Sequence, residues 1–240
     1  MRRANAIFDS KYLFVVSMLV TPSLPARAAE PAPQAAAEHH PAAPALTPAQ
    51  ALERLMEGNA RFVQGKVQHP HQTAQWRSGL TSGQHPIAAV LGCSDSRVPV
   101  EELFDQGFGD LFVIRVAGNV AGEDERGSIE YAVAHLNVPL VLVVGHESCG
   151  AVTAALSPES ERRREAAEVQ ALLAHIEPAL KALATGTPEE RVLRGVEANA
   201  RLSAAQLADT PLLKEKIAHG QLAVKAAVYE LGTGRIRPVD

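Results

Sequence analysis

The sequence lacks features that mark several large classes of protein. Its formal net charge is −4, so it has no basic excess, and nucleic acid is not an expected partner. No repeat of solenoid length is visible. The apolar stretch Tyr12–Val20 is shorter than the roughly 20 residues of a transmembrane helix, so no permanent membrane span is expected. Cysteine is scarce as well, with two residues in 240.

The first 28 residues have the layout of a secretory signal peptide. Two arginines precede the apolar stretch, and Ala26–Ala28 forms a small-x-small pattern. We therefore expect cleavage after Ala28 and an exported, periplasmic protein, by a route that stays open; an uncleaved anchor or a frayed tail is the alternative. Residues 29–45, rich in Ala and Pro, are expected to form a flexible leader. Residues 46–240 suit a single domain.

Four runs predict strands, namely Pro86–Gly92, Leu111–Gly118, Pro139–His146 and Gln221–Glu230. The first three are nearly continuous apolar segments, as expected for strands that are covered on both faces. Helical patterns lie around them, in 47–66, 73–80, Val100–Phe104, Arg126–Leu136, Ala151–Leu156, Ser160–Ala184, Pro188–Ala208 and Pro211–Gly220. This alternation predicts an α/β domain in which helices flank a mainly parallel central sheet.

Both cysteines follow apolar strands. Cys93 directly follows the first run, His146 ends the third, and Cys149 lies three residues further on. Ligand sites in parallel α/β sheets gather beyond the carboxyl ends of the strands, and thiolate with imidazole is a donor set that suits zinc. Three protein ligands leave one position open, which favours a catalytic zinc site. A disulfide between the cysteines and a structural zinc with a distant histidine are the alternatives.

The segments CSDSR (Cys93–Arg97) and HESCG (His146–Gly150) resemble motifs of the β-class carbonic anhydrases in both residues and spacing. The resemblance runs from about Leu46 to the C-terminus. It implies one Zn²⁺ per chain on Cys93, His146 and Cys149, and a catalytic dyad of Asp95 and Arg97. The implied reaction is the reversible hydration of CO2 to bicarbonate and a proton, by attack of zinc-bound hydroxide.

Charge explains why such a site needs the dyad. Zinc with two thiolates and a neutral imidazole is formally neutral, so it acidifies bound water less than a site of three histidines does. Asp95 can accept a hydrogen bond from that water, but it can also bind zinc itself and close the site. Arg97 offers Asp95 a bidentate partner that holds it off the metal. A surface ion pair is the alternative interpretation.

The resemblance also implies a substrate pocket formed by Gln84, Phe112, Ala117, Tyr131 and Gly150. Ala117 stands where plant-type members carry a bulkier valine, and plain core packing is an alternative role for Phe112 and Tyr131. Family members are homodimers or larger homo-oligomers in which the N-terminal helix packs on a neighbouring subunit. Pocket residues are often contributed across that dimer interface.

Subtype and substrate can be interpreted from a few further positions. Val90 stands where the bicarbonate-inhibited subtype carries tryptophan, so the resemblance implies the plant-type, open-site subtype. His85 is a candidate proton shuttle. Two alternatives to CO2 hydration remain. One is a hydrolase of the same scaffold acting on carbon disulfide or carbonyl sulfide, and the other is a non-enzymatic zinc or thiol protein.

Overall fold

This computed structural model describes residues 46–183 and 185–239. The signal peptide and leader predicted for residues 1–28 and 29–45 lie outside the described residues. Within the described ranges, no helix combines the length and the apolar character that crossing a membrane requires.

The sheet has five strands in the order β2-β1-β3-β4-β5. The four predicted strands are present as β1 (Ala88–Gly92), β2 (Leu111–Arg115), β3 (Leu140–His146) and β4 (Ala223–Tyr229), and they pair in parallel. The fifth strand, β5 (Ile236–Val239), pairs antiparallel with β4 and was not predicted. The prediction of a mainly parallel α/β domain is confirmed.

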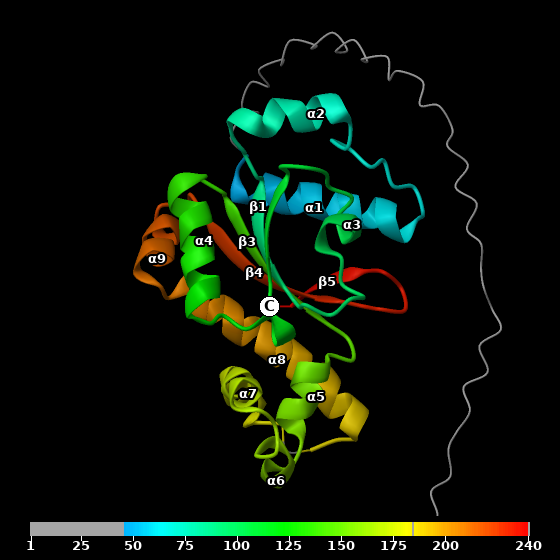
Figure 1. Ribbon diagram of the computed structural model, residues 1–240, viewed down its shortest axis with the longest axis vertical. Helices are drawn as coiled ribbons and strands as arrows, with labels where there is room; N and C mark the ends of the chain where they lie inside the picture. The colour runs from blue at the N-terminus through cyan, green and yellow to red at the C-terminus, as the bar shows by residue number, and fades with distance from the viewer. Residues whose placement is uncertain (1–45, 184, 240) are drawn as a thin grey trace, which may run out of the picture. The chain divides into compact units, whose positions relative to one another are not determined.

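Helices cover both faces of the sheet (Figure 1). Alternate strand residues, such as Val90 and Leu142, pack with α1 (Pro48–Val63) and α3 (Val100–Leu103). The residues between them, such as Leu91 and Val143, pack with α4 (Glu123–His135), α8 (Pro188–Ala208) and α9 (Pro211–Ala218). Burial on both faces explains why β1 and β3 are continuous apolar runs rather than alternating ones.

Side-chain hydrogen bonds define where the two longest helices begin. Thr47 and Gln50 form a capping box at the start of α1, and Thr187 and Glu190 form another at the start of α8. In each case the side chains satisfy backbone N–H groups that have no partner within the helix. The remaining helical elements are α2 (Ala74–Gly79), η1 (Leu80–Ser82), η2 (Ala117–Asn119), α5 (Gly150–Leu156), α6 (Glu159–Arg162) and α7 (Ala167–Leu180).

The single helix predicted over Ser160–Ala184 was wrong, because the chain forms α6 and α7 there with a break between them. Ala166, just before α7, has an extended backbone. The break lets Arg162 donate a hydrogen bond to Glu177 at 3.0 Å. Such a contact, 15 residues apart, requires the chain to reverse. The neighbouring Arg163–Glu159 pair is exposed to solvent.

Helix α1 packs on the sheet of its own chain, where Ala51 and Leu55 are fully buried against Val90 and Leu142. Its other residues leave apolar area accessible, including Val63, which is 40% exposed. Packing of this helix on a neighbouring subunit therefore concerns a different face of α1, and it stays a prediction.

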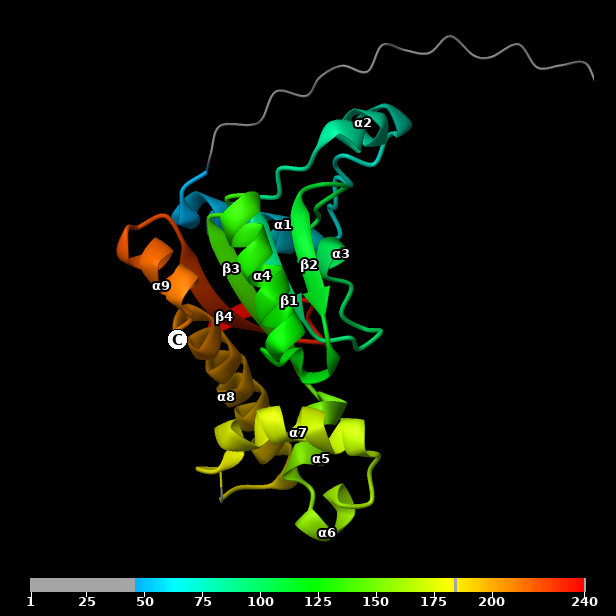
Figure 2. The same ribbon diagram turned by 60° about the vertical axis from the view of Figure 1, so that its left-hand side comes forward.

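The two ends of the sheet carry different elements (Figures 1 and 2). Helix α2 lies beyond the amino ends of the strands, and α5, α6 and α7 lie beyond the carboxyl ends. After β1 the chain continues to β2 on one side and then crosses to β3 on the other. The carboxyl ends of β1 and β3 therefore form a topological switch point, where α/β sheets commonly bind ligands.

Candidate metal centre

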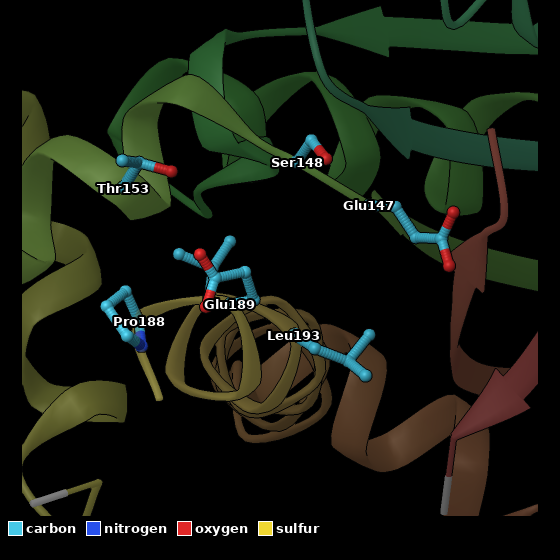
Figure 3. A pocket seen from close by; sticks show the side chains of 7 residues that line it. Glu147, Ser148, Thr153, Pro188, Glu189 and Leu193 are labelled. Carbon is cyan, nitrogen blue, oxygen red and sulfur yellow. The ribbon is translucent and has the colours of Figure 1, made fainter. Parts of the chain in front are cut away.

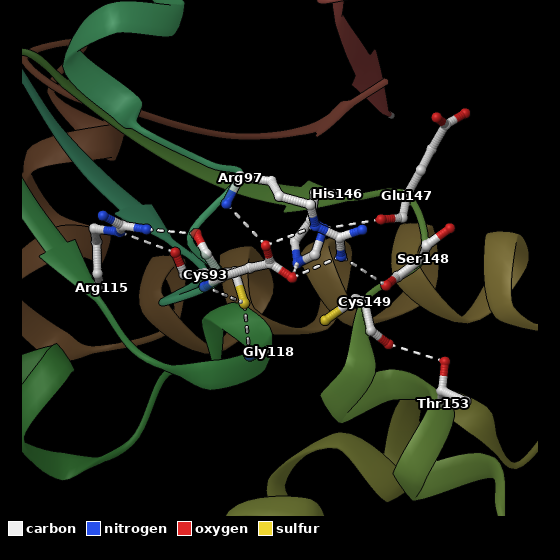
Figure 4. A network of polar contacts seen from close by, with 10 residues as sticks. Cys93, Arg97, Arg115, Gly118, His146, Glu147, Ser148, Cys149 and Thr153 are labelled. Atoms are coloured by element: carbon white, nitrogen blue, oxygen red, sulfur yellow. Dashed lines mark hydrogen bonds and ion pairs between the residues drawn. The ribbon is translucent and has the colours of Figure 1, made fainter. Parts of the chain in front are cut away.

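Cys93, His146 and Cys149 meet at this switch point (Figure 4). Cys93 follows β1 directly, His146 is the last residue of β3, and Cys149 is the N-cap of α5. One sulfur or nitrogen atom from each residue lies within 4.8 Å of the others, and all three residues are buried. No second cluster of this kind is found in residues 46–183 and 185–239.

The His146 ring has one nitrogen engaged and one unpartnered. Nδ1 is 2.9 Å from the carbonyl oxygen of Glu147, so Nδ1 carries the proton and donates. Nε2 is buried without a hydrogen-bond partner in the structure. A buried polar atom without a partner is destabilising, and a neutral imidazole with its second nitrogen held in this way is the usual state of a metal ligand.

Both thiols are free, which removes the predicted alternative of a disulfide. A hydrogen bond from the Cys149 thiol lowers the pKa of Cys93 to about 4, against the opposing effect of burial. The amides of Asp95 and Gly118 act in the same direction, since each donates to Cys93 Sγ, at 3.4 and 3.3 Å. The shared hydrogen bond raises the pKa of Cys149, because that thiol then holds the proton.

The donor set fits a zinc ion. Thiolate and imidazole ligands at zinc lie about 2.0–2.3 Å from the metal, and three such ligands in a tetrahedron are separated by distances compatible with the cluster here. The metal would take the second cysteine proton away as well, because a bound thiol is deprotonated outright. The three residues could therefore bind a soft metal ion, which would have one position left for another ligand.

Asp95 lies beside the three candidate ligands and is held by Arg97. Arg97 Nε and Nη2 donate to the two carboxylate oxygens of Asp95 at 2.9 and 2.7 Å, and its amide donates at 2.9 Å. These bonds hold the pKa of Asp95 well below its ordinary range. Asp95 Oδ2 lies only 3.8 Å from His146 Nε2. The carboxylate is thus within a small movement of the metal ligands but is bound to the guanidinium.

Two contacts at this site were not predicted from the sequence. Arg115, the last residue of β2, donates to the carbonyl oxygens of Cys93 at 3.0 Å and Asp95 at 2.6 Å. It thereby fixes the backbone between Cys93 and Asp95. Arg97 also donates to the carbonyl oxygen of Ser148 at 3.3 Å, which joins the loop after β1 to the loop after β3. A charged residue at the end of the apolar run LFVIR was the available signal for Arg115.

The residues of the predicted substrate pocket fall into two groups. Ala117 precedes Gly118, whose amide donates to Cys93, and Gly150 follows Cys149. Both therefore lie at the metal site. The others, Gln84, Phe112 and Tyr131, lie away from it.

Gln84 is exposed and precedes β1, whereas Cys93 follows it. The five residues of that strand span roughly 16 Å. Phe112 pairs with Ala89 near the amino end of β1, and its ring lies 6.3 Å from that of Tyr131, which is 51% exposed. The described chain thus does not bring these side chains to its own metal cluster.

A cavity of about 430 Å³ lies next to the loop between His146 and Cys149, but these two residues and Cys93 do not line it (Figure 3). It is lined by Glu147 and Ser148 of the loop, Thr153 of α5 and four residues of α8, namely Pro188, Glu189, Val192 and Leu193. None of the predicted substrate-pocket residues lines it. This cavity is therefore distinct from the pocket expected over the metal.

Comparisons with known proteins identify the family of this chain. A family model described as carbonic anhydrase matches residues 88–236. "Carbonic anhydrase 2" of Mycobacterium tuberculosis is 42% identical over 193 residues, which cover 80% of this chain and 93% of that protein.

Two solved structures share the fold. The β-carbonic anhydrase CafA of Aspergillus fumigatus matches with a TM-score of 0.64 and 30% identity over 80% of this chain and 90% of that one. One of two tetrameric β-carbonic anhydrases of Sordaria macrospora matches with a TM-score of 0.62 and 28% identity, over 79% and 97%. The chain therefore belongs to the β-class carbonic anhydrase family, which makes it an enzyme of the lyase class.

Proposed function

We propose that this enzyme interconverts CO2 and bicarbonate with a zinc ion bound to Cys93, His146 and Cys149. The observation that carries the proposal is the buried three-ligand cluster, whose His146 Nε2 has no hydrogen-bond partner. Zinc held there would act as a Lewis acid that makes water a nucleophile near neutral pH. The family supports CO2 as the substrate.

Asp95 and Arg97 orient the reacting groups in this proposal. Asp95 is ionised at neutral pH, and Arg97 lowers its pKa further, so it can accept a hydrogen bond at the open metal position. Arg97 uses Nε and Nη2 to keep both carboxylate oxygens occupied. In a closed state, Asp95 would leave Arg97 and become a metal ligand itself. Arg115 holds the backbone on which this choice depends.

A second copy of the chain completes the substrate pocket in this proposal. The metal half of the site is assembled within one chain, but Gln84, Phe112 and Tyr131 lie toward the other end of the sheet. Gln84 and Tyr131 are exposed, and Phe112 is half-buried. A homodimer or larger homo-oligomer places them over a partner's metal site, with Ala117 and Gly150 contributed in cis. A tetrameric β-carbonic anhydrase among the structural relatives supports such an assembly.

Two further features of the proposal rest on the sequence. The N-terminal pattern of residues 1–28 supports export to the periplasm with cleavage after Ala28. Val90, which is fully buried on the α1 side of β1, supports the open-site subtype because it stands where the inhibited subtype carries tryptophan.

Stopped-flow measurement of CO2 hydration by the zinc-loaded mature protein tests the proposal. We expect rapid hydration of CO2 and little hydrolysis of carbon disulfide or carbonyl sulfide under the same conditions. Faster turnover of either sulfur compound would assign the enzyme to the alternative substrate. Bound zinc without turnover of any of the three compounds would favour a non-catalytic zinc protein.

A further inference from the structure

Asn199 is a buried polar residue in the middle of α8, only 1% exposed. Its neighbours on the buried face of this helix are mostly apolar or small, for example Val196 and Ala200. Its Oδ1 atom has no hydrogen-bond partner in the structure. Such an atom is destabilising in a core, so packing alone would favour an apolar residue here.

The side-chain amide of Asn199 instead makes a single hydrogen bond. Its Nδ2 donates to the carbonyl oxygen of Gly118 at 2.6 Å. A carbonyl only accepts, which fixes which side-chain atom is the nitrogen. The amide of Gly118 in turn donates to Cys93 Sγ at 3.3 Å. Gly118 is therefore held on both sides, by Asn199 through its carbonyl and by Cys93 through its N–H.

The backbone conformation of Gly118 and its close packing restrict this position to glycine. Its φ of +70° is in the left-handed region, and a Cβ atom would lie 2.7 Å from Ile176 Cδ1 and 3.1 Å from Ala151 Cβ. Glycine is thus required both by the backbone conformation and by the close approach of α5 and α7. The hydrogen bond from Asn199 fixes the orientation of the Gly118 carbonyl group.

We propose that Asn199 is a positioning residue of the metal site, acting through Gly118 on the Cys93 sulfur. The inference rests on the proposed metal site. An N–H···S bond withdraws electron density from a thiolate, so the metal receives less charge from its ligand. That matters here because two thiolates already neutralise the formal charge of a zinc ion. Outer-shell partners of this type tune metal affinity and reactivity.

The test is the spectrum of the cobalt-substituted full-length protein. We expect Asn199→Leu, which removes the donor, to move the thiolate-to-cobalt charge-transfer band to lower energy and to change metal affinity roughly 10-fold. Affinity is measured by competition with a chromophoric chelator, at one metal ion per chain. Asn199→Ala is the second variant, which avoids crowding of the core.

Asn59 on α1 provides the matched control. It is buried too, and it bonds the carbonyls of Leu103 and Gly234 and the amide of Ile236. Asn59→Leu should lower stability but leave the cobalt band at its wild-type energy. A band shift of the same size in the control would show a general effect of destabilisation and overturn the inference.

A measurement on the unmutated chain completes the test. In the ¹¹³Cd-substituted protein, a scalar coupling between cadmium and the Gly118 amide proton is expected through the N–H···S bond. Absence of that coupling, or an unshifted band and unchanged affinity in both Asn199 variants, would overturn the inference alone. If the wild-type chain took up neither cobalt nor cadmium, the proposed function would fail first.

Discussion

The two ends of the sheet differ in how much of the site one chain assembles. At the carboxyl end, Cys93, His146 and Cys149 converge, and Asp95 is already bound to Arg97. At the amino end, the segment leading to Gln84 carries predicted substrate contacts but surrounds no metal cluster. A single chain thus assembles the three candidate metal ligands, whereas the substrate pocket that we propose would be completed by a second copy.

The amino end is nevertheless well ordered by its own polar contacts. Asp105 is buried and accepts hydrogen bonds from Arg61 at 2.6 Å and from the amides of Gln68 and His69. The ring of Trp76 in α2 stacks on His71 at 3.7 Å between centroids. These contacts give the segment a defined conformation, which a surface that binds a partner subunit requires.

The largest effect is expected from losing a metal ligand at the carboxyl end. Cys149→Ser replaces a thiolate with a poorer zinc ligand, so zinc content should fall sharply. CO2 hydration should fall by more than the roughly 100-fold that marks the upper range for lost outer-shell partners. Metal analysis and stopped-flow kinetics measure the two losses. Unchanged zinc content would remove Cys149 from the site.

Arg97→Ala should separate metal binding from activity. Without Arg97, Asp95 is free to take the open metal position, so we expect zinc to stay bound while CO2 hydration falls about 100-fold. X-ray absorption should show an added carboxylate oxygen ligand. Near-full activity in this variant would contradict the role given to the dyad.

Mixed oligomers test the contrast between the two ends directly. Gln84→Ala alone should lower activity about 10-fold, for one lost hydrogen bond to substrate, and Cys149→Ser alone should be inactive. Co-assembled in equal amounts, they should recover about a quarter of wild-type activity, since half of randomly formed dimers are mixed and each has one intact site of two. Activity equal to the average of the two parents would place Gln84 in its own chain's site.

The smallest effect on activity is expected from Asp105→Asn. Burial would raise the pKa of Asp105, but hydrogen bonds from Arg61, Gln68 and His69 outweigh it and lower the pKa. A lowered folded-state pKa stabilises the fold above the unfolded value of about 3.9, and this stabilisation is lost as the pH falls through the folded value.

The variant should therefore be less stable by about 3 kcal/mol at pH 7. Its deficit should shrink as the pH falls below the unfolded pKa of Asp105, while zinc content stays at the wild-type level. Urea unfolding at several pH values measures this. A deficit independent of pH would show that the carboxylate charge is not what stabilises this segment.

The strands and the metal cluster were predictable because each leaves a local signal. Apolar, strand-like runs predict β1 to β4, and the cysteines and histidine placed at or just after the ends of β1 and β3 predict the site. Strand β5 left no such signal, since it has four residues, two of them Arg237 and Pro238. It is stabilised by pairing with β4, which is a long-range contact.

Contacts between distant elements explain the other misses. The break between α6 and α7 allows Arg162 to pair with Glu177, a contact that no local helix propensity encodes. Asn199 lies 81 residues from Gly118. Its only sequence signal was a polar side chain on the apolar face of a predicted helix. The positions of Gln84 and Tyr131 relative to the metal could only be seen once the direction of β1 was known.

A zinc titration of the metal-free mature protein, followed by stopped-flow CO2 hydration, tests the central claim most directly. If the metal on Cys93, His146 and Cys149 provides the activity, hydration should rise in proportion to added zinc. It should stop rising at one ion per chain. Full activity of the metal-free protein, or zinc bound at one ion per chain with no gain in hydration, would contradict the account.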